Sequence, residues 1–455
     1  MLITKKFTAR LNKFFKIYKC KRNAANAGEN GMENELIKAK KILKEFKGGS
    51  YIFGLNCLDR IGDLAIKFGN EILLIISHSK WAKNLRENIL ESFKNKKIKI
   101  LKIVDASKPN APREDVYRIQ DEIEKLNPEL LVAVGGGSTI DCVKASSILA
   151  TYSPGKHEIE PFFGTGKVTE FMNKIGKKKT PILAVQIASS SGAHLTRYSN
   201  VTDIETNQKK LIVDDAIIPE AAIFDYSVTI NMGRDLTTDG ALDGIAHALE
   251  VYYGAPNDKI DEIEEVALLT IDMIVKNLPK VLKEPKNLEY REKIGLGTDL
   301  GGYAIMIGGT NGGHLTSFSL VDILTHGRAC SILNPYYTVF FAPAIVRQLR
   351  NLYGIYSEYI EKDLNLESVS ARELSEAVAK GMINFSKKIG VPVKLQEVEG
   401  FTDEHIVRAV AAAKNPQLEM KLKNMPVPLN SSTVSDYMKL ILESAKTGDF
   451  SIIKN

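Results

Sequence analysis

Hydrophobic and polar positions alternate in two different ways along the first half of the chain. Short runs rich in β-branched residues have the length of strands, and they cover residues 72–76, 98–104, 130–134 and 182–185. Apolar residues recur with helical spacing in the segments between them, at residues 81–95, 113–126 and 138–150. This alternation predicts an α/β domain with a doubly wound sheet, whose ligands bind at the carboxyl ends of the strands.

The pattern changes after residue 231, where strand-like runs cease and helical periodicity continues to the end of the chain. The clearest helical segments are residues 239–254, 261–278, 337–359, 371–389 and 433–445. Residues 206–225, just before the change, predict a hairpin-like pair of strands leading to Asp225. We therefore expect a dinucleotide-binding-type α/β domain over residues 32–230 and an all-helical domain over residues 231–455.

The composition of the chain limits which classes of protein and which locations are expected. The chain has 455 residues, of which 44% are hydrophobic, and no apolar run approaches the roughly 18 residues needed to span a bilayer. Its four cysteines are scattered without a CxxC pair, so neither a disulfide framework nor a thiolate zinc site is indicated. A reducing compartment, the cytoplasm, is the expected location.

The net charge of +6 belongs to the N-terminal extension. Residues 1–31 hold eight Lys or Arg and one acid, Glu29, whereas the remaining chain has 53 basic and 54 acidic residues. A nucleic-acid-binding surface is therefore not expected. The extension can be read as an organelle-targeting presequence, as a membrane-surface or partner-binding arm, or as an upstream extension before the helix that Met32 opens. We favour a disordered or incidental extension.

Four side chains are candidate metal ligands. Asp243 and His247 stand four residues apart in a helical segment, which places a carboxylate and an imidazole on one face. His314 and His326 follow downstream. Such spacings also occur by chance, but unpaired imidazoles in otherwise apolar segments would be costly. Three histidines and one aspartate suit Fe(II) or Zn(II) with a coordination position left open.

A second candidate site follows the strand at residues 130–134. The chain continues as Gly135, Gly136, Gly137 and Ser138, and then enters a helix that carries Asp141. Glycines allow a phosphate to approach the backbone, and the free N–H groups of a helix N-terminus favour negative charge. The alternative interpretation is a tight turn without a ligand, since the pattern is not the common GxGxxG.

Three motifs in this order resemble the iron-containing (group III) alcohol dehydrogenases over roughly residues 35–450. They are GGGSTIDCVKA, DGALDGIAHALEVY and ILTHGRACSILNPYYTVFFAPA. The resemblance implies a homodimer, with a dinucleotide-binding domain and a helical metal-binding domain in each subunit. It assigns Asp243, His247, His314 and His326 as ligands of Fe(II), with Zn(II) possible. It also assigns the coenzyme contacts, which are Gly135, Gly136, Gly137, Ser138, Asp141, Ser191 and either Lys209 or Lys210.

The chain departs from the family pattern at several positions. His314 and His326 are 12 residues apart, which is closer than usual in the family. Phe318 stands where many members have a histidine that relays protons. His194 replaces the acid of a loop that here is rich in serine. His78 occupies the position at which many NAD-preferring members have Asp, and this change favours NADP.

The resemblance implies reversible hydride transfer between NAD(P) and a small alcohol or aldehyde, whose oxygen a metal polarises as a Lewis acid. No separate protein base is assigned. Two other functions stay open at this point. One is a phosphate-ester (glycerol-phosphate-like) dehydrogenase of the same superfamily, for which Arg197 and Arg328 are candidate basic residues. The other is a catalytically silent protein that binds nucleotide and metal.

Overall fold

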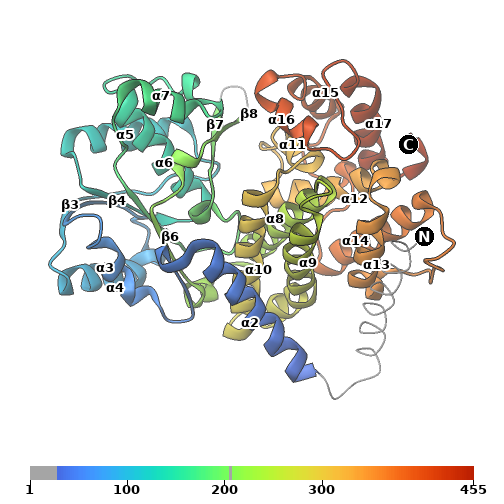
Figure 1. Ribbon diagram of the computed structural model, residues 1–455, viewed down its shortest axis with the longest axis horizontal. Helices are drawn as coiled ribbons and strands as arrows, with labels where there is room; N and C mark the ends of the chain where they lie inside the picture. Colours follow the sequence, from blue (N-terminus) through green and yellow to red (C-terminus); the bar gives the residue numbers. More distant parts are fainter. Residues whose placement is uncertain (1–27, 204–207) are drawn as a thin grey trace.

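A computed structural model of the chain describes residues 28–203 and 208–455. Figure 1 shows two lobes, one containing the sheet and drawn in blue to green, the other helical and drawn in yellow to red. Most of the basic extension, residues 1–27, lies outside the described residues, as do the expectations for it. No helix within the described ranges is both long and apolar enough to cross a membrane.

The first lobe is built on a six-stranded sheet with the order β1-β9-β6-β4-β2-β3, in which every neighbouring pair is parallel. In sheet order the strands are β1 (Tyr51–Gly54), β9 (Ala221–Asp225), β6 (Ile182–Gln186), β4 (Leu130–Gly135), β2 (Glu71–Ile75) and β3 (Lys99–Val104). This confirms the doubly wound α/β domain. Because β2 and β4 are adjacent although β3 separates them in sequence, the chain reverses direction across the sheet beside β4.

Helices cover both faces of this sheet. They are α3 (Ile61–Ala65), α4 (Lys83–Asn95), α5 (Arg113–Leu126) and α6 (Gly137–Tyr152), with α7 (Lys167–Ile175) farther out. Alternate residues of β2 point to opposite faces. Leu73 joins the core that contains residues of α5 and α6, whereas Leu74 joins a separate core with residues of α3 and α4. Buried two-sided strands of this kind read as continuous hydrophobic runs.

A small second sheet corrects one prediction from the sequence. It has the order β5-β8-β7, with β5 (Gly164–Thr165) parallel to β8 (Gln208–Val213), and β7 (Tyr198–Asp203) antiparallel to β8. The predicted pairing within residues 206–225 is therefore wrong, because β8 pairs with the preceding strand. The second run of that segment is β9, which is buried along its whole length between β6 and β1 in the main sheet.

The second lobe is predominantly helical, which confirms the expected helical C-terminal region. Its helices are α8 (Arg234–Tyr253), α9 (Ile260–Lys283), α10 (Leu288–Ile307), α11 (Gly312–Ser317), α12 (His326–Phe340), α13 (Val346–Ile355), α14 (Ala371–Ile389), α15 (Asp403–Ala412), α16 (Glu419–Lys423) and α17 (Val434–Thr447). Helix α8 lies at the centre, against α9, α10 and α12 (Figure 1). Its residues from Gly240 to Tyr253 are all buried, so any polar group on it needs a partner inside the protein.

Two helix boundaries differ from the sequence predictions. Residues 337–359 do not form one helix, because α12 ends at Phe340 and a 3₁₀ turn containing Pro343 separates it from α13. Proline cannot donate a backbone hydrogen bond, so it ends the first helix here. The helix predicted over residues 261–278 is longer, since α9 continues past Pro279 to Lys283.

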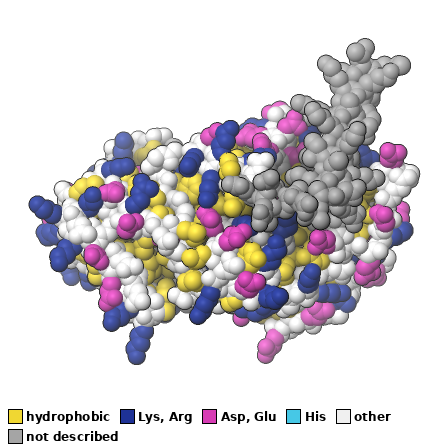
Figure 2. All heavy atoms as spheres, turned by 90° about the horizontal axis from the view of Figure 1, so that it is seen from below, with side chains coloured by type: hydrophobic (Ala, Val, Ile, Leu, Met, Phe, Trp, Pro, Cys, Tyr) yellow, Lys and Arg dark blue, Asp and Glu magenta, His cyan; other side chains and the backbone are white. Residues whose placement is uncertain are grey.

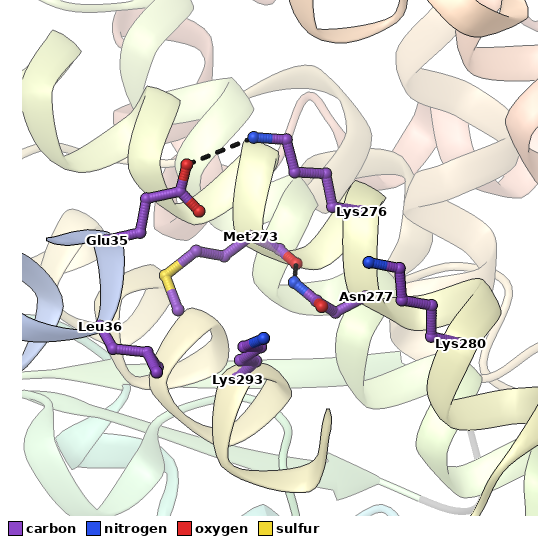
Figure 3. A pocket seen from close by; sticks show the side chains of 7 residues that line it. All are labelled: Glu35, Leu36, Met273, Lys276, Asn277, Lys280 and Lys293. Carbon is purple, nitrogen blue, oxygen red and sulfur yellow. Dashed lines mark hydrogen bonds and ion pairs between the residues drawn. The ribbon is translucent and has the colours of Figure 1, made fainter. Parts of the chain in front are cut away.

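The first described helix, α2 (Gly28–Lys47), begins four residues before Met32 and lies against the helical lobe. Figure 3 shows Glu35 and Leu36 facing Met273 and Asn277 of α9, with Glu35 3.3 Å from the ammonium of Lys276. Figure 2 shows basic and acidic side chains interspersed over the described part of the face seen from below. No field of a single sign dominates that face.

Candidate metal centre and coenzyme site

Helix α8 supplies two of the candidate ligands. Asp243 and His247 are each about 5% exposed, and Asp243 Oδ1 lies 3.8 Å from His247 Nε2. The i,i+4 spacing within a helix produces this juxtaposition, as the sequence predicted. Because the helix is buried at this level, both side chains point into the interior of the protein.

Helices α11 and α12 bring His314 and His326 to the same place. His314 Nε2 lies 3.7 Å from Asp243 Oδ1. The ring centroid of His314 is 4.8 Å from that of His247 and 4.7 Å from that of His326. The end of the short helix α11 and the loop before α12 connect the two histidines, which stand 12 positions apart. We call Asp243, His247, His314 and His326 the donor cluster.

Several buried atoms of the donor cluster lack hydrogen-bond partners. Among the described residues, no partner reaches Asp243 Oδ1, His247 Nδ1 or His314 Nε2. Leaving such an atom unpaired costs about 1–3 kcal/mol. Donor atoms that bind one cation at about 2.0–2.2 Å lie roughly 3–4 Å apart, as the closest pairs do here. The residues present therefore fit a divalent metal.

Two further side chains orient the histidines. Glu250 Oε1 lies 2.8 Å from His314 Nδ1, and Glu250 Oε2 accepts the backbone N–H groups of Asn311 and His314. Ser317 Oγ lies 2.8 Å from His326 Nδ1. These contacts leave the Nε2 atoms of both rings facing the donor cluster, which is the arrangement that ligating histidines require. The sequence interpretation missed Glu250, although a glutamate one turn after His247 in an apolar helix was a usable signal.

Electrostatics favour the protonation states that a metal needs at three of the four side chains, and His314 is the exception. Burial lowers the pKa of His247 to about 4 and holds that of His326 well below its usual value. Burial alone would raise the pKa of Asp243, but the nearby imidazoles of His247 and His314 bring it below the usual range. Burial would lower the pKa of His314, yet nearby Cys330 and Glu250 raise it. Neutral imidazoles and an ionised carboxylate are the states that bind metal.

Cys330 is a buried thiol next to the donor cluster that the sequence interpretation did not select. Its Sγ and the ring nitrogens of His314 and His326 lie within 4.8 Å of one another. It stands four residues after His326, so it shares a face of α12 with that histidine. Burial raises the pKa of Cys330, which keeps the thiol protonated in the absence of a cation.

The glycine loop has the geometry of a phosphate site. Helix α6 begins at Gly137, and no side chain caps its N-terminal N–H groups. A Cβ at Gly135 or Gly137 would meet a side chain at 2.5 Å, whereas a Cβ at Gly136 would have only Ala188 within 4 Å, at 3.8 Å. Open space beside Gly136, at an uncapped 16-residue helix, fits a pyrophosphate. Ser138 Oγ accepts the backbone N–H of Asn110 at 3.0 Å.

The other expected coenzyme residues fall into two groups. Buried Asp141 Oδ1 and Ser191 Oγ have no hydrogen-bond partner within the described ranges, and both residues line the pocket described below. Lys209 lies near Asp141 and Asp243, and burial lowers its pKa. Lys210 points the other way along β8, 3.5 Å from Glu160 and over the ring of Phe163. Of the two lysines, only Lys209 faces the site.

His78 lies in the loop after β2, at the same sheet edge as the glycine loop. It is exposed, and its backbone N–H donates to Asp105 Oδ1 at 2.9 Å. Arg86 lies beneath this loop and donates to the carbonyls of Ser77 and Ser79. The loop therefore presents an imidazole, hydroxyls and a nearby guanidinium instead of a carboxylate.

A pocket with about 50 Å³ of free volume separates the coenzyme residues from the donor cluster. Its lining includes Asp141 and Ser191 on one side, and His247, His314, His326, Phe318 and Lys421 on the other. Phe318 is buried and stacks on His326 with ring centroids 5.5 Å apart. The place of the family's relay histidine is thus an apolar contact. No sequence pattern singled out Lys421, whose side chain is buried in the wall of this pocket.

Comparison with known proteins agrees with the three motifs. The model of the iron-containing alcohol dehydrogenase family matches residues 49–226, and that of its C-terminal domain matches residues 237–442. The NAD-dependent methanol dehydrogenase of Bacillus methanolicus is 23% identical over 86% of this chain and 96% of its own length. The NADPH-dependent butanol dehydrogenase of Clostridium saccharobutylicum is 24% identical over 76% of this chain and 84% of its own.

Solved structures show the same fold. The alcohol dehydrogenase from Oenococcus oeni superposes with a TM-score of 0.74 at 22% identity, covering 87% of this chain and 98% of its own. A 1,3-propanediol oxidoreductase gives a TM-score of 0.72 at 21% identity, with the same coverage. At these identities the likeness establishes the architecture of both lobes.

Proposed function

This chain belongs to the iron-containing alcohol dehydrogenase family and is an oxidoreductase acting on alcohols, and we propose that it transfers hydride between NADP(H) and a short alcohol or aldehyde. In this proposal the donor cluster holds the metal, Fe(II) or alternatively Zn(II). The glycine loop at Gly135, Gly136, Gly137 and Ser138 holds the coenzyme pyrophosphate. The homodimer and the cytoplasmic location expected from the sequence stay predictions.

One observation carries the proposal. His247 and His314, which carry unpaired ring nitrogens, line one side of a pocket together with His326, and Asp141 and Ser191, which carry unpaired oxygens, line its other side. When bound, a divalent metal supplies Lewis acidity and a nicotinamide supplies the hydride donor or acceptor. A pocket that places both sets of contacts a few ångströms from a shared space supports direct transfer between them.

The residues of the chain have distinct roles in this proposal. Glu250 and Ser317 fix the ring orientation of His314 and His326. Phe318 excludes water beside His326. A proton released from an alcohol leaves through the pocket itself, since among the described residues no histidine other than those of the donor cluster lines it.

Coenzyme choice rests on the loop after β2. The relatives named above include one NAD-dependent and one NADPH-dependent enzyme, so the family alone does not fix the choice. A carboxylate after this strand would bind the ribose 2′-hydroxyl and repel a 2′-phosphate. His78 offers no such charge, and Asp105 nearby already accepts N–H groups from His78 and Ala106. These contacts support NADP.

The phosphate-ester alternative lacks support from its candidate residues. Arg197 donates to the carbonyl of Met306 and pairs with Asp215. Arg328 pairs with Asp239 and Asp235. Neither guanidinium lines the pocket. A phosphate group on the substrate would therefore not meet these two arginines.

The test is anaerobic reconstitution of the purified protein with Fe(II) or Zn(II), followed by oxidation of NADPH and NADH with short aldehydes. Asp243→Ala and His326→Ala are compared with the control His157→Ala. His157 is half exposed and stacks on Tyr117 of α5, outside the donor cluster. We expect turnover that requires metal and is lost in the first two variants only. NADPH binding without turnover under any metal would favour the catalytically silent alternative.

A further inference from the structure

Lys421 is a buried ammonium group in the wall of the pocket. The side chain comes from α16, only 4% of the residue is exposed, and it lines the pocket together with His247 and His314. Nζ donates to Thr310 Oγ1 at 2.5 Å and lies 5.2 Å from the ring centroid of Phe318. The ammonium has three N–H donors, and these two groups supply one hydrogen-bond acceptor and one aromatic face.

No carboxylate in the described part of the chain neutralises Lys421 directly. Within the described ranges, no acidic oxygen lies within ion-pair distance of its Nζ. Glu250 is the acid that acts on it most, but both oxygens of Glu250 are already engaged by His314 and by backbone N–H groups. Burying a charge without a hydrogen-bonded counter-charge costs free energy of folding. A purely structural role for Lys421 would therefore destabilise the protein.

The position of Lys421 indicates which ligand it meets. The coenzyme residues Asp141 and Ser191 line the pocket from the N-terminal lobe, whereas Lys421, Thr310 and Phe318 all belong to the helical lobe that carries the donor cluster. A small molecule held at the donor cluster therefore lies on the same side as the ammonium. The nucleotide reaches the pocket from the opposite side.

We propose that Lys421 recognises an anionic group on the substrate, so that the preferred substrates are short alcohols or aldehydes bearing a carboxylate or sulfonate. The proposal deepens the proposed dehydrogenase function and rests on it. The anion pairs with the Lys421 ammonium and accepts a hydrogen bond from Thr310, while the reacting carbon faces the coenzyme. The small free volume of the pocket limits such substrates to a few carbon atoms.

The test compares ω-oxo acids with neutral aldehydes of the same chain length, from two to four carbons, on the metal-loaded enzyme with NADPH. We expect the wild type to favour the acids in kcat/KM by about 10- to 100-fold, as a charge-assisted hydrogen bond contributes. Lys421→Met removes this preference while turnover of the neutral aldehydes persists. Lys423→Met is the matched control, because Lys423 lies on the same helix, is exposed and pairs with Glu419.

A second readout does not depend on turnover. Calorimetry measures the binding of propionate, and of propanol as its neutral counterpart, to the metal-loaded protein. We expect propionate to bind more tightly than propanol, and this difference to vanish in Lys421→Met. Equal loss of acid and neutral substrates in that variant, or a wild-type preference for the neutral aldehydes, would overturn the proposal. Failure of every aldehyde to react, with propionate still bound through Lys421, would instead overturn only the dehydrogenase function.

Discussion

His314 Nδ1 lies 2.8 Å from Glu250 Oε1, and this contact leaves the Nε2 atom of the same ring 3.7 Å from Asp243 Oδ1. The carboxylate that orients His314 thus comes from the same helix as Asp243 and His247. Because α8 carries Asp243, His247 and Glu250, one helix fixes most of the site.

The first prediction concerns this contact. Glu250→Gln keeps the side-chain volume but removes the charge that holds His314 in one tautomer. We expect metal affinity to fall about 10- to 100-fold, with little change in secondary structure. Metal content after dialysis against graded chelator measures the effect. Glu265→Gln, at an exposed glutamate paired with Lys38, is the control. Equal metal retention in the two variants would show that Glu250 has no orienting role.

The second prediction concerns the glycine loop. Gly136→Ala adds a methyl group whose nearest neighbour is 3.8 Å away, so the fold tolerates it. The same methyl group fills the space beside the helix N-terminus, and we expect the KM for NADPH to rise about tenfold or more. Fluorescence titration with NADPH checks the affinity separately. Gly49→Ala, where no atom lies within 4 Å, is the control. Unchanged affinity would place the pyrophosphate elsewhere.

Much of the fold could be predicted from the sequence because parallel strands that are buried on both faces need hydrophobic side chains at every position. Strand β4 is buried at every residue, so it appears in the sequence as an unbroken hydrophobic run before three glycines. Strand β1 was missed because its four residues, only the first of them buried, give too short a pattern. The pairing of β8 was mispredicted because strand partners depend on contacts between distant segments, which periodicity does not encode.

Some residues of the site could be predicted from the sequence and others could not. Asp243 and His247 followed from local helix geometry, and His314 and His326 followed from resemblance. Glu250 and Lys421 did not, because their roles arise from contacts made after α11 packs against α8 and α12, and α16 packs against α11. A lysine in a short helix looks the same in the sequence whether it is exposed, as Lys423 is, or buried.

The third prediction tests coenzyme choice. His78→Asp places a carboxylate in the loop after β2, where it would repel a 2′-phosphate and accept a hydrogen bond from a 2′-hydroxyl. We expect the ratio of kcat/KM for NADPH over NADH to fall by at least about tenfold. His78→Asn, which adds no charge, separates the electrostatic effect from the loss of the imidazole. A ratio that is the same in wild type and His78→Asp would mean that the ribose lies away from this loop.

The fourth prediction concerns a buried polar network between the lobes. Asp299 of α10 accepts hydrogen bonds from Tyr51 and Tyr226, and its other oxygen lies 3.3 Å from His194 Nε2. Asp299→Ala leaves these groups without their common partner. We expect a loss of about 2–4 kcal/mol in the free energy of unfolding, measured in urea.

Asp299→Asn tests whether that loss reflects the hydrogen bonds or the charge. The amide oxygen still accepts from a tyrosine, so its destabilisation is expected to be smaller than that of the alanine variant. Asp235→Ala, at an 87% exposed side chain, controls for removal of an aspartate. Similar stability of the two Asp299 variants and the control would contradict the assigned role of the network.

The last prediction is a pH dependence of substrate choice. Burial lowers the pKa of Lys421 to about 8, although Glu250 and Cys330 act in the opposite direction. The charged form is present below that pH and is lost above it. A bound divalent cation lowers the pKa further, so the loss begins at or below about pH 8. The kcat/KM for an ω-oxo acid should then fall about tenfold per pH unit on the alkaline side.

The comparison that isolates Lys421 is with a neutral aldehyde on the same enzyme preparation. Titration of the donor cluster or of the coenzyme contacts affects both substrates, so only the ratio of their kcat/KM values reports the ammonium. In Lys421→Arg the guanidinium keeps its charge at every accessible pH, and the alkaline fall of the ratio should disappear. An alkaline fall that persists unchanged in the arginine variant would assign the titration to another group.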